Sequence, residues 1–250
     1  MRTVIAIIPA RYAATRLPGK PLADIAGKPM IQHVYERAAR ARVDRVLVAT
    51  DDARIEAAVR AFGGEAMLTA STHVSGSDRV AEAARSLKAD WIVNVQGDEP
   101  LLHPEMLDQL LEPLRNDPAI PMATLAHPLT DREDFLSPDV VKVVCTRGGF
   151  ALYFSRAPLP VARGREGVPR EALRHIGLYA YRADFLQQFA RLDPTPLEQS
   201  EKLEQLRALE HGFPIRVVTT RHHALGVDTP TDLERVRRMF AQARGDAPGF

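Results

Sequence analysis

The chain has 250 residues, of which 45% are hydrophobic and 26% are charged, and its formal net charge at pH 7 is +1. This composition suits a globular protein with ample apolar material for a core. The near-neutral charge gives no overall positive field that would draw the protein to nucleic acid or anionic lipid, so any anion-binding site must be local.

The sequence also excludes several other classes of protein. Its single cysteine, Cys145, rules out an internal disulfide framework and a cysteine-rich zinc site, and its strand-like surroundings favour a small buried side chain. The apolar run 4–8 is too short for a secretion signal, and no segment reaches membrane-spanning length. We therefore expect a cytoplasmic protein that contacts neither membrane nor nucleic acid.

Short apolar runs predict the strands of a central sheet. In chain order these runs are 4–8, 46–49, 65–68, 91–95, 122–126, 140–145, 151–155, 174–182 and 215–219. Helical patterns alternate with them in the first half of the chain, with helices expected from Pro29, up to Phe62, over 75–86 and over 104–114. This alternation predicts an α/β fold with a mostly parallel mixed sheet and helices on both faces.

The second half of the chain is less regular. Residues 156–173 are rich in Arg, Pro and Gly, which predicts a mobile loop or lid. Two helices are expected over roughly 183–192 and 198–211. The Thr-Pro-Thr-Asp sequence at 229–232 is a capping-box pattern, and it predicts the start of a last helix that ends near Gly245.

The stretch 8–20, directly after the first predicted strand, is a candidate anion site. It carries Arg11, Arg16 and Lys20. In open α/β sheets, ligands bind beyond the carboxyl ends of the strands, where backbone N–H groups and fixed cations suit a chain of phosphates. The competing interpretation is that these are ordinary solvated surface charges. The stretch has no G-x-G-x-x-G pattern, and Pro21 after Lys20 excludes a Walker A loop.

Two acidic residues follow other predicted strands. Asp98 lies in Gln-Gly-Asp-Glu-Pro after the strand 91–95, and Asp228 lies just before the last helix. A parallel sheet could bring both to the edge where the stretch 8–20 lies, and two carboxylates beside phosphates suit Mg²⁺. Alternatively, Asp98 caps a turn and Asp228 assists a helix start, because Asp favours both places.

Two further pairs carry weaker signals. His175 and Tyr179 lie four residues apart in a strand pattern, so both should point to one face of the sheet. Glu204 and Gln205 are expected in the middle of a helix, where such residues are most often solvated. Neither pair alone indicates a chemistry.

Taken together, the motifs resemble the 3-deoxy-D-manno-octulosonate (Kdo) cytidylyltransferase family, also called CMP-Kdo synthetases. The resemblance begins with the cationic stretch and continues through the segments 48–51, 75–79, 93–100, 151–157, 174–179, 203–207 and 226–230. The cationic stretch is shared by sugar nucleotidyltransferases in general. His-Ile-Gly-Leu-Tyr at 175–179 and Glu-Gln-Leu-Arg at 204–207 are more specific to the Kdo branch.

The resemblance implies a fold, a reaction and partners. Members of this family have a Rossmann-like nucleotidyltransferase fold, are usually homodimers, and use Mg²⁺ to make CMP-Kdo and pyrophosphate from CTP and Kdo for lipopolysaccharide assembly. We accordingly predict one nucleotidyltransferase domain over 1–250, in which an insertion at about 125–212 serves sugar binding and dimer formation.

The resemblance also implies site residues by position. The triphosphate loop would contain Ala10, Arg11, Arg16 and Lys20, and the cytosine and ribose pocket would contain Gly76, Ser77, Arg79 and Gln96. The magnesium ligands would be Asp98 and Asp228, which with Lys20 and Arg11 form the predicted catalytic set. The Kdo pocket would contain Arg156, His175, Tyr179, Glu204 and Gln205.

The chain departs from the family pattern in two places, and other functions compete with this one. Ser77-Asp78 replaces the usual Thr-Glu, and the segment 156–173 is short and arginine-rich, so only Arg156 is carried over from it. The nearest alternative is a cytidylyltransferase for a related sugar acid, 8-amino-Kdo or sialic acid. A non-catalytic nucleotide-binding regulator is another, whereas an NAD-dependent oxidoreductase lacks its glycine fingerprint.

Overall fold

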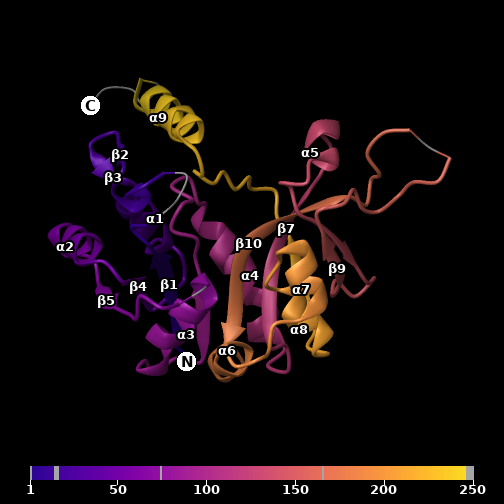
Figure 1. The fold of residues 1–250 in the computed structure, drawn as a ribbon, viewed down its shortest axis with the longest axis horizontal. Helices are drawn as coiled ribbons and strands as arrows, with labels where there is room; N and C mark the ends of the chain where they lie inside the picture. The colour runs from indigo at the N-terminus through magenta and orange to yellow at the C-terminus, as the bar shows by residue number, and fades with distance from the viewer. Residues whose placement is uncertain (1, 14–16, 74, 165, 246–250) are drawn as a thin grey trace. The chain divides into compact units, whose positions relative to one another are not determined.

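A computed structural model describes residues 2–13, 17–73, 75–164 and 166–245 (Figure 1). The chain forms two compact units. The first unit comprises Met1–Glu105 and Ala224–Phe250, and the second comprises Met106–His223. The predicted insertion at about 125–212 remains a prediction, because a division by compactness does not assign roles to the two parts.

The first unit is built on a parallel sheet. Its strands lie in the order β6-β1-β4-β5, and each adjacent pair is parallel. Their bounds are Val4–Ala10 for β1, Arg45–Thr50 for β4, Ala66–Leu68 for β5 and Trp91–Asn94 for β6. The central strands are buried along nearly their whole length, as continuous apolar runs require when both faces of a parallel sheet are covered.

Helices alternate with these strands as predicted. The first unit contains α1 (Met30–Ala38), α2 (Ala53–Ala61), α3 (Gly76–Arg85) and α9 (Pro230–Gly245). It also contains a short 3-10 turn, Lys20–Leu22, and a two-stranded hairpin of β2 (Asp24–Ile25) and β3 (Lys28–Pro29), none of which was predicted. Both α1 and α3 pack against β1.

Side-chain caps mark the starts of α2, α3 and α9. The Asp52 carboxylate accepts a hydrogen bond from the Arg54 N–H at 2.9 Å at the start of α2. A capping box joins Ser75 and Asp78 at the start of α3. The predicted pattern before α9 is confirmed, because the Asp232 carboxylate accepts from Thr229 N at 2.9 Å.

The second unit has a mixed sheet. Strand β7 (Met122–Pro128) lies between β11 (Ile215–Thr219), which is parallel to it, and β10 (Leu173–Arg182), which is antiparallel. The antiparallel strands β8 (Lys142–Cys145) and β9 (Ala151–Ser155) extend from β10. Its helices are α4 (Pro104–Asn116, begun in the first unit), α5 (Arg132–Leu136), α6 (Ala183–Phe189), α7 (Pro196–Glu201) and α8 (Leu206–Glu210).

The α/β prediction is therefore confirmed, but some elements were predicted wrongly. The expected continuous helix over 198–211 is wrong, because Lys202 adopts a left-handed conformation (φ 55°) that ends α7. Lysine carries no local signal for such a break, which glycine usually provides. Helix α5 was not predicted. The segment between β9 and β10 forms no helix or strand over its described residues, as expected.

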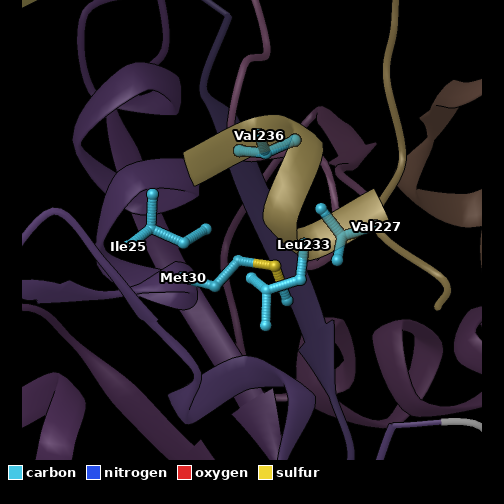
Figure 2. Close-up of a cluster of buried hydrophobic side chains, with 5 residues drawn as sticks. All are labelled: Ile25, Met30, Val227, Leu233 and Val236. Atoms are coloured by element: carbon cyan, nitrogen blue, oxygen red, sulfur yellow. The ribbon is translucent and has the colours of Figure 1, made fainter. Parts of the chain in front are cut away.

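The last helix is anchored in the first unit by an apolar cluster. Ile25 and Met30 are fully buried against Val227, Leu233 and Val236, and Figure 2 shows the side chains converging. The cluster therefore joins the segment after β1 to the start of α9 and positions the residues just before that helix. Among the described residues, no helix has the length and apolar character needed to cross a bilayer.

Replacing Met30 tests this anchoring. Met30→Ala should destabilise the first unit by about 2–5 kcal/mol, because it leaves a cavity in a fully buried cluster. The chain's single tryptophan, Trp91, lies in β6, so its fluorescence during urea unfolding follows this unit. The control is Met239→Ala on α9, whose side chain is 41% exposed and whose loss should cost at most about 0.5 kcal/mol. Equal urea midpoints for the two variants would contradict the anchoring role.

Candidate active site

A pocket of about 230 Å³ lies in the first unit, where β1 ends. Described residues of the cationic stretch and of the segment that follows β6 line it. Six predicted site residues line it: Ala10, Arg11, Lys20, Gly76, Gln96 and Asp98. The carboxyl ends of parallel strands thus bring together residues from three distant segments, as expected for this class of sheet.

Glycine allows the two strand exits to approach each other. A Cβ atom built on Gly97 would lie 2.8 Å from the carbonyl oxygen of Pro9, at the end of β1. Gly97 therefore brings Asp98 close to β1 in a way that a larger residue would prevent. At Gly76, by contrast, a Cβ would lie 3.5 Å from the Pro9 ring, which is ordinary contact.

Lys20 lies between the two predicted metal ligands. Its Nζ donates to Asp98 Oδ2 at 2.6 Å and to Asp228 Oδ1 at 3.2 Å. Burial alone would lower the pKa of Lys20, but the two carboxylates outweigh burial and raise its pKa above the usual value. The prediction that Asp98 and Asp228 come together at the same sheet edge as the cationic stretch is therefore confirmed.

Arg11 supplies a second cation to the pocket. Its Nη2 atom is buried and has no hydrogen-bond partner among the described residues. A buried guanidinium donor without a partner is costly, so its presence in a pocket favours an anionic ligand. Arg16, the third cation of the stretch, lies outside the described residues.

Two side chains that the sequence did not single out support the cationic stretch. The Tyr12 ring packs against Gly19, which has a positive φ of 70° and donates its N–H to the Tyr12 carbonyl at 3.0 Å. The Arg54 guanidinium lies 3.3 Å from the Tyr12 ring centroid and pairs with Asp52. These contacts position the turn that begins at Lys20.

The other two predicted nucleotide residues within the described part of the chain are buried and lie outside the pocket lining. Ser77 is buried, and Arg79 is fully buried with its Nη1 on Thr69 Oγ1 at 2.6 Å and its Nη2 on Asp51 Oδ2 at 2.7 Å. Arg79 thus ties together the segments that follow β4 and β5. Neither residue lines the pocket, and their contact with a nucleotide remains a prediction.

In the second unit, His175 and Tyr179 share one face of β10. Their rings lie 5.5 Å apart. The pairing of β10 with β7 is irregular between these two residues, and the irregularity leaves both side chains on the same face of the strand. The Thr124 hydroxyl donates to the Leu178 carbonyl at 2.8 Å, so it accepts from His175 Nε2 at 3.0 Å. Burial lowers the pKa of His175 to about 3, which keeps the ring neutral.

Tyr179 lies close enough to Glu204 to feel its charge. Burial raises the pKa of Tyr179 well above its usual value, and the neighbouring Tyr181 hydroxyl and Glu204 carboxylate add to the effect. Glu204 and Gln205 lie in the turn between α7 and α8, so their expected mid-helix position is wrong. Gln205 is buried, and its Nε2 has no partner in the part of the chain that the structure describes.

Arg156 is held at several points by residues that sequence reasoning missed. Its backbone N–H donates to Glu201 Oε2 at 2.9 Å, and its Nε donates to the Glu201 carbonyl at 2.8 Å. Lys142, which is fully buried, donates to the carbonyls of Arg156, Ser137 and Val140 at 2.5–2.8 Å. A lysine in a strand pattern gives no sequence signal for this role.

Comparisons with known proteins agree with the geometry. The protein-family model described as "Cytidylyltransferase" matches residues 5–219. Relatives named 3-deoxy-manno-octulosonate cytidylyltransferase from Geobacter sulfurreducens and Syntrophobacter fumaroxidans are 56% and 58% identical over 243 residues. These matches cover 93% and 96% of this chain and 97% of each relative.

Solved structures give the same result. One, described as CMP:2-keto-3-deoxy-manno-octonic acid synthetase complexed with CTP, has a TM-score of 0.91 and 47% identity, and covers 96% of this chain and 99% of that one. A nucleotidyl transferase from Methanothermobacter has a TM-score of 0.63 at 18% identity over 96% of this chain and 99% of its own, which indicates a shared fold alone.

Gly97 provides a test of the close approach at the pocket. Gly97→Ala should lower the thermal midpoint, at a cost of about 1–3 kcal/mol, because its Cβ meets a backbone oxygen that cannot move freely. Gly76→Ala is the matched control, since its Cβ has room and alanine is the better residue in a helix. Differential scanning calorimetry of both variants measures the effect. A Gly97→Ala protein as stable as Gly76→Ala would contradict the packing described here.

His175 gives a prediction on pH. The unfolded histidine takes up a proton near pH 6.5 and the native one only near pH 3, so the unfolded state binds more protons between these values. Stability should therefore fall as the pH drops from about 6.5. The urea midpoint, followed by circular dichroism between pH 7 and pH 4.5, should fall less steeply in His175→Gln than in wild type. His211→Gln, at an exposed histidine, is the control and should keep the wild-type slope.

Proposed function

Because this chain belongs to the cytidylyltransferase family, we propose that it transfers the CMP part of CTP to the anomeric hydroxyl of Kdo, which yields CMP-Kdo and pyrophosphate. The names of relatives that are more than half identical over nearly the whole chain support this substrate pair. The CTP in the description of the similar solved structure supports the choice of nucleotide. The product would serve lipopolysaccharide assembly.

One observation in the structure carries the proposal: a pocket at a parallel-sheet edge is lined by two cations and the Asp98 carboxylate, and the Asp228 carboxylate contacts one of those cations, Lys20. Arg11 and Lys20 suit the phosphates of a nucleotide, and Asp98 and Asp228 converge beside them. A neutral sugar alone would leave the buried Arg11 Nη2 without an anionic partner.

The reaction forms a bond between the sugar oxygen and the α-phosphorus of CTP as the bond to pyrophosphate breaks. Such a transfer depends mainly on positioning and on stabilisation of charge at the phosphate oxygens. We assign Lys20 and Arg11 to this charge stabilisation, with Ala10, Gly76 and Gln96 shaping the pocket around the nucleotide. Arg16, Ser77 and Arg79 belong to the same proposed nucleotide set.

The residues present fit a magnesium ion. Asp98 and Asp228 already place one oxygen each around a single cation, the Lys20 ammonium, and hard carboxylate oxygens are the ligands Mg²⁺ prefers. When bound there, Mg²⁺ would supply positive charge beside the α-phosphate. Asp98 and Asp228 would hold it.

We assign the binding of the sugar to a set of polar residues in the second unit. Neutral His175, with Tyr179 beside it, would offer hydrogen bonds to sugar hydroxyls, and so would Glu204 and Gln205. Arg156 would pair with the sugar carboxylate. The hydrogen bonds from Arg156 Nε to the Glu201 carbonyl at 2.8 Å and from Nη1 to the Pro138 carbonyl at 2.9 Å support this role, because a preorganised guanidinium loses less conformational freedom on binding.

The remaining assignments concern assembly and location. We propose a homodimer, with no nucleic-acid or membrane partner, on the basis of the family. A cytoplasmic location fits the use of CTP as a substrate. The runner-up function is cytidylyl transfer to a related sugar acid, either 8-amino-Kdo or sialic acid, which would use the same nucleotide pocket.

Pyrophosphate release tests the function directly. The assay contains Mg²⁺ and CTP, with and without Kdo, and parallel reactions contain UTP, 8-amino-Kdo or sialic acid. Release that requires both CTP and Kdo is expected. Release with another sugar acid would support the proposed nucleotide site but show that the sugar substrate is not Kdo. Binding of CTP without any release would favour a non-catalytic regulator.

The two central charged residues should dominate turnover. Asp98→Asn and Lys20→Met should each lower kcat by at least about 10²–10³. Lys20→Met removes a preorganised positive charge from beside the transferring phosphate, and Asp98→Asn removes a carboxylate that would hold Mg²⁺ there. Asp139→Asn and Lys88→Met, at exposed positions, are the controls and should leave the rate unchanged. A folded Asp98→Asn enzyme with a near-normal rate would refute its catalytic role.

Arg156 should affect the sugar and not the nucleotide. Arg156→Met should raise the KM for Kdo about 10- to 100-fold, because a hydrogen bond to a charged group is worth about 1.5–3 kcal/mol. The KM for CTP should stay within about twofold. Arg163→Met, on the same segment and exposed, is the control. An increase confined to the KM for CTP would show that the assignment is wrong.

A further inference from the structure

The Lys20 ammonium occupies the point where two carboxylates converge. Its Nζ lies 2.6 Å from Asp98 Oδ2 and 3.2 Å from Asp228 Oδ1. These are the residues that the proposed function assigns to a divalent ion. The Lys20 ammonium and the divalent ion therefore compete for one position, since an ammonium and a metal ion cannot occupy the same place.

The backbone segments that carry Asp98 and Asp228 are held together by contacts other than those of the Lys20 side chain. The Val227 N–H donates to the Asp98 carbonyl at 2.9 Å, which joins the two segments directly. The Asp228 N–H donates to Asp232 Oδ2 at 3.2 Å, and Val227 is buried in the apolar cluster of α9 (Figure 2). The two acids should therefore still converge after the ammonium has moved away.

Lys20, in contrast, can move its charge without moving its backbone. The backbone is fixed by hydrogen bonds from Lys20 N to Leu17 O and from Ala23 N to Lys20 O, both 3.1 Å long. The ammonium is carried on a flexible four-carbon stem, and 17% of the side chain is exposed. A rotation of the side chain alone can redirect the charge within the pocket that Lys20 already lines.

Electrostatics couple this movement to the nucleotide. A triphosphate in the pocket beside Arg11 brings several negative charges, which attract Lys20 away from the carboxylates. It also places those charges next to Asp98 and Asp228, and like charges at close range are unfavourable without a cation between them. The departure of Lys20 and the arrival of a divalent ion would thus favour each other.

We propose that Lys20 is a built-in counter-ion that holds the Asp98–Asp228 pair closed to divalent metal until a nucleotide triphosphate draws its ammonium to the phosphates. This inference rests on the proposed function and adds an order of ligand binding to it. Nucleotide binds ahead of the divalent ion at this pair, and Lys20 takes a different anionic partner in each state.

Metal binding in the absence of nucleotide and sugar tests the proposal. Free Mn²⁺ is measured by its electron paramagnetic resonance signal during titration with wild-type protein, Lys20→Met and Lys20→Gln. Both variants remove the ammonium, so each should bind Mn²⁺ at least about tenfold more tightly than wild type, within the usual range of coupling between sites. The gain should vanish in Lys20→Met/Asp98→Asn. Having two variants keeps the test valid if one of them folds poorly.

Two controls separate this effect from a general change in charge. Lys28→Met removes the ammonium that pairs with Glu36 in the same unit and should leave Mn²⁺ binding unchanged. Lys20→Arg keeps a cation at the site and should show no gain.

Three results would overturn the proposal: no gain in either Lys20 variant, a gain that survives Asp98→Asn, or an equal gain in Lys28→Met. None of these depends on turnover. The pyrophosphate assay would therefore still stand if the proposal failed, and failure of the assay would not alter the binding result.

Discussion

The contact between the Lys20 ammonium and the carboxylates of Asp98 and Asp228 is the interaction on which the candidate site depends. It joins three segments that are far apart in the chain: the turn after β1, the loop after β6 and the residues before α9. Partly buried charges are tolerable only when they are paired. The fold therefore has to deliver all three segments to one place, and most features around the pocket serve that requirement.

The first unit meets this requirement with a few local devices. Gly97 lets the loop after β6 lie against the Pro9 carbonyl, and the positive φ of Gly19 starts the turn that carries Lys20. The apolar cluster around Met30 packs the start of the last helix, and with it Asp228, against the rest of the first unit. None of these residues has reactive chemistry of its own. Their effect is to set the distances between groups that do.

The second unit uses buried polar groups to position a charged side chain. Lys142 has no exposed surface, yet its ammonium donates to three backbone carbonyls, so its burial is compensated. Glu201 accepts from the Ser155 hydroxyl at 2.6 Å and from the Arg156 N–H. Together they hold Arg156 from both sides of its backbone. The guanidinium itself is held through its Nε, which donates to the Glu201 carbonyl at 2.8 Å, and a guanidinium held in place is suited to orienting a carboxylate.

The sequence by itself determined the alternation of strands and helices, because the period of apolar residues and the capping pattern at Thr229 are local properties. It also determined which segments carry the chemistry, since Arg11, Lys20 and Asp98 follow predicted strands and ligands bind at that edge of a parallel sheet. The specific sugar-acid family came from the resemblance of whole motifs.

Only the tertiary structure decided the rest, because it depends on contacts between distant residues. The ammonium of Lys20 between two acids, the buried pairing of Arg79 with Asp51 and the contact of Lys142 with the Arg156 carbonyl have no local pattern. The break at Lys202 is of the same kind: lysine rarely adopts a left-handed conformation, and here the fold imposes it. Residue types and periodicity report what each segment can do, whereas partner, burial and pKa are set by the neighbours that folding brings together.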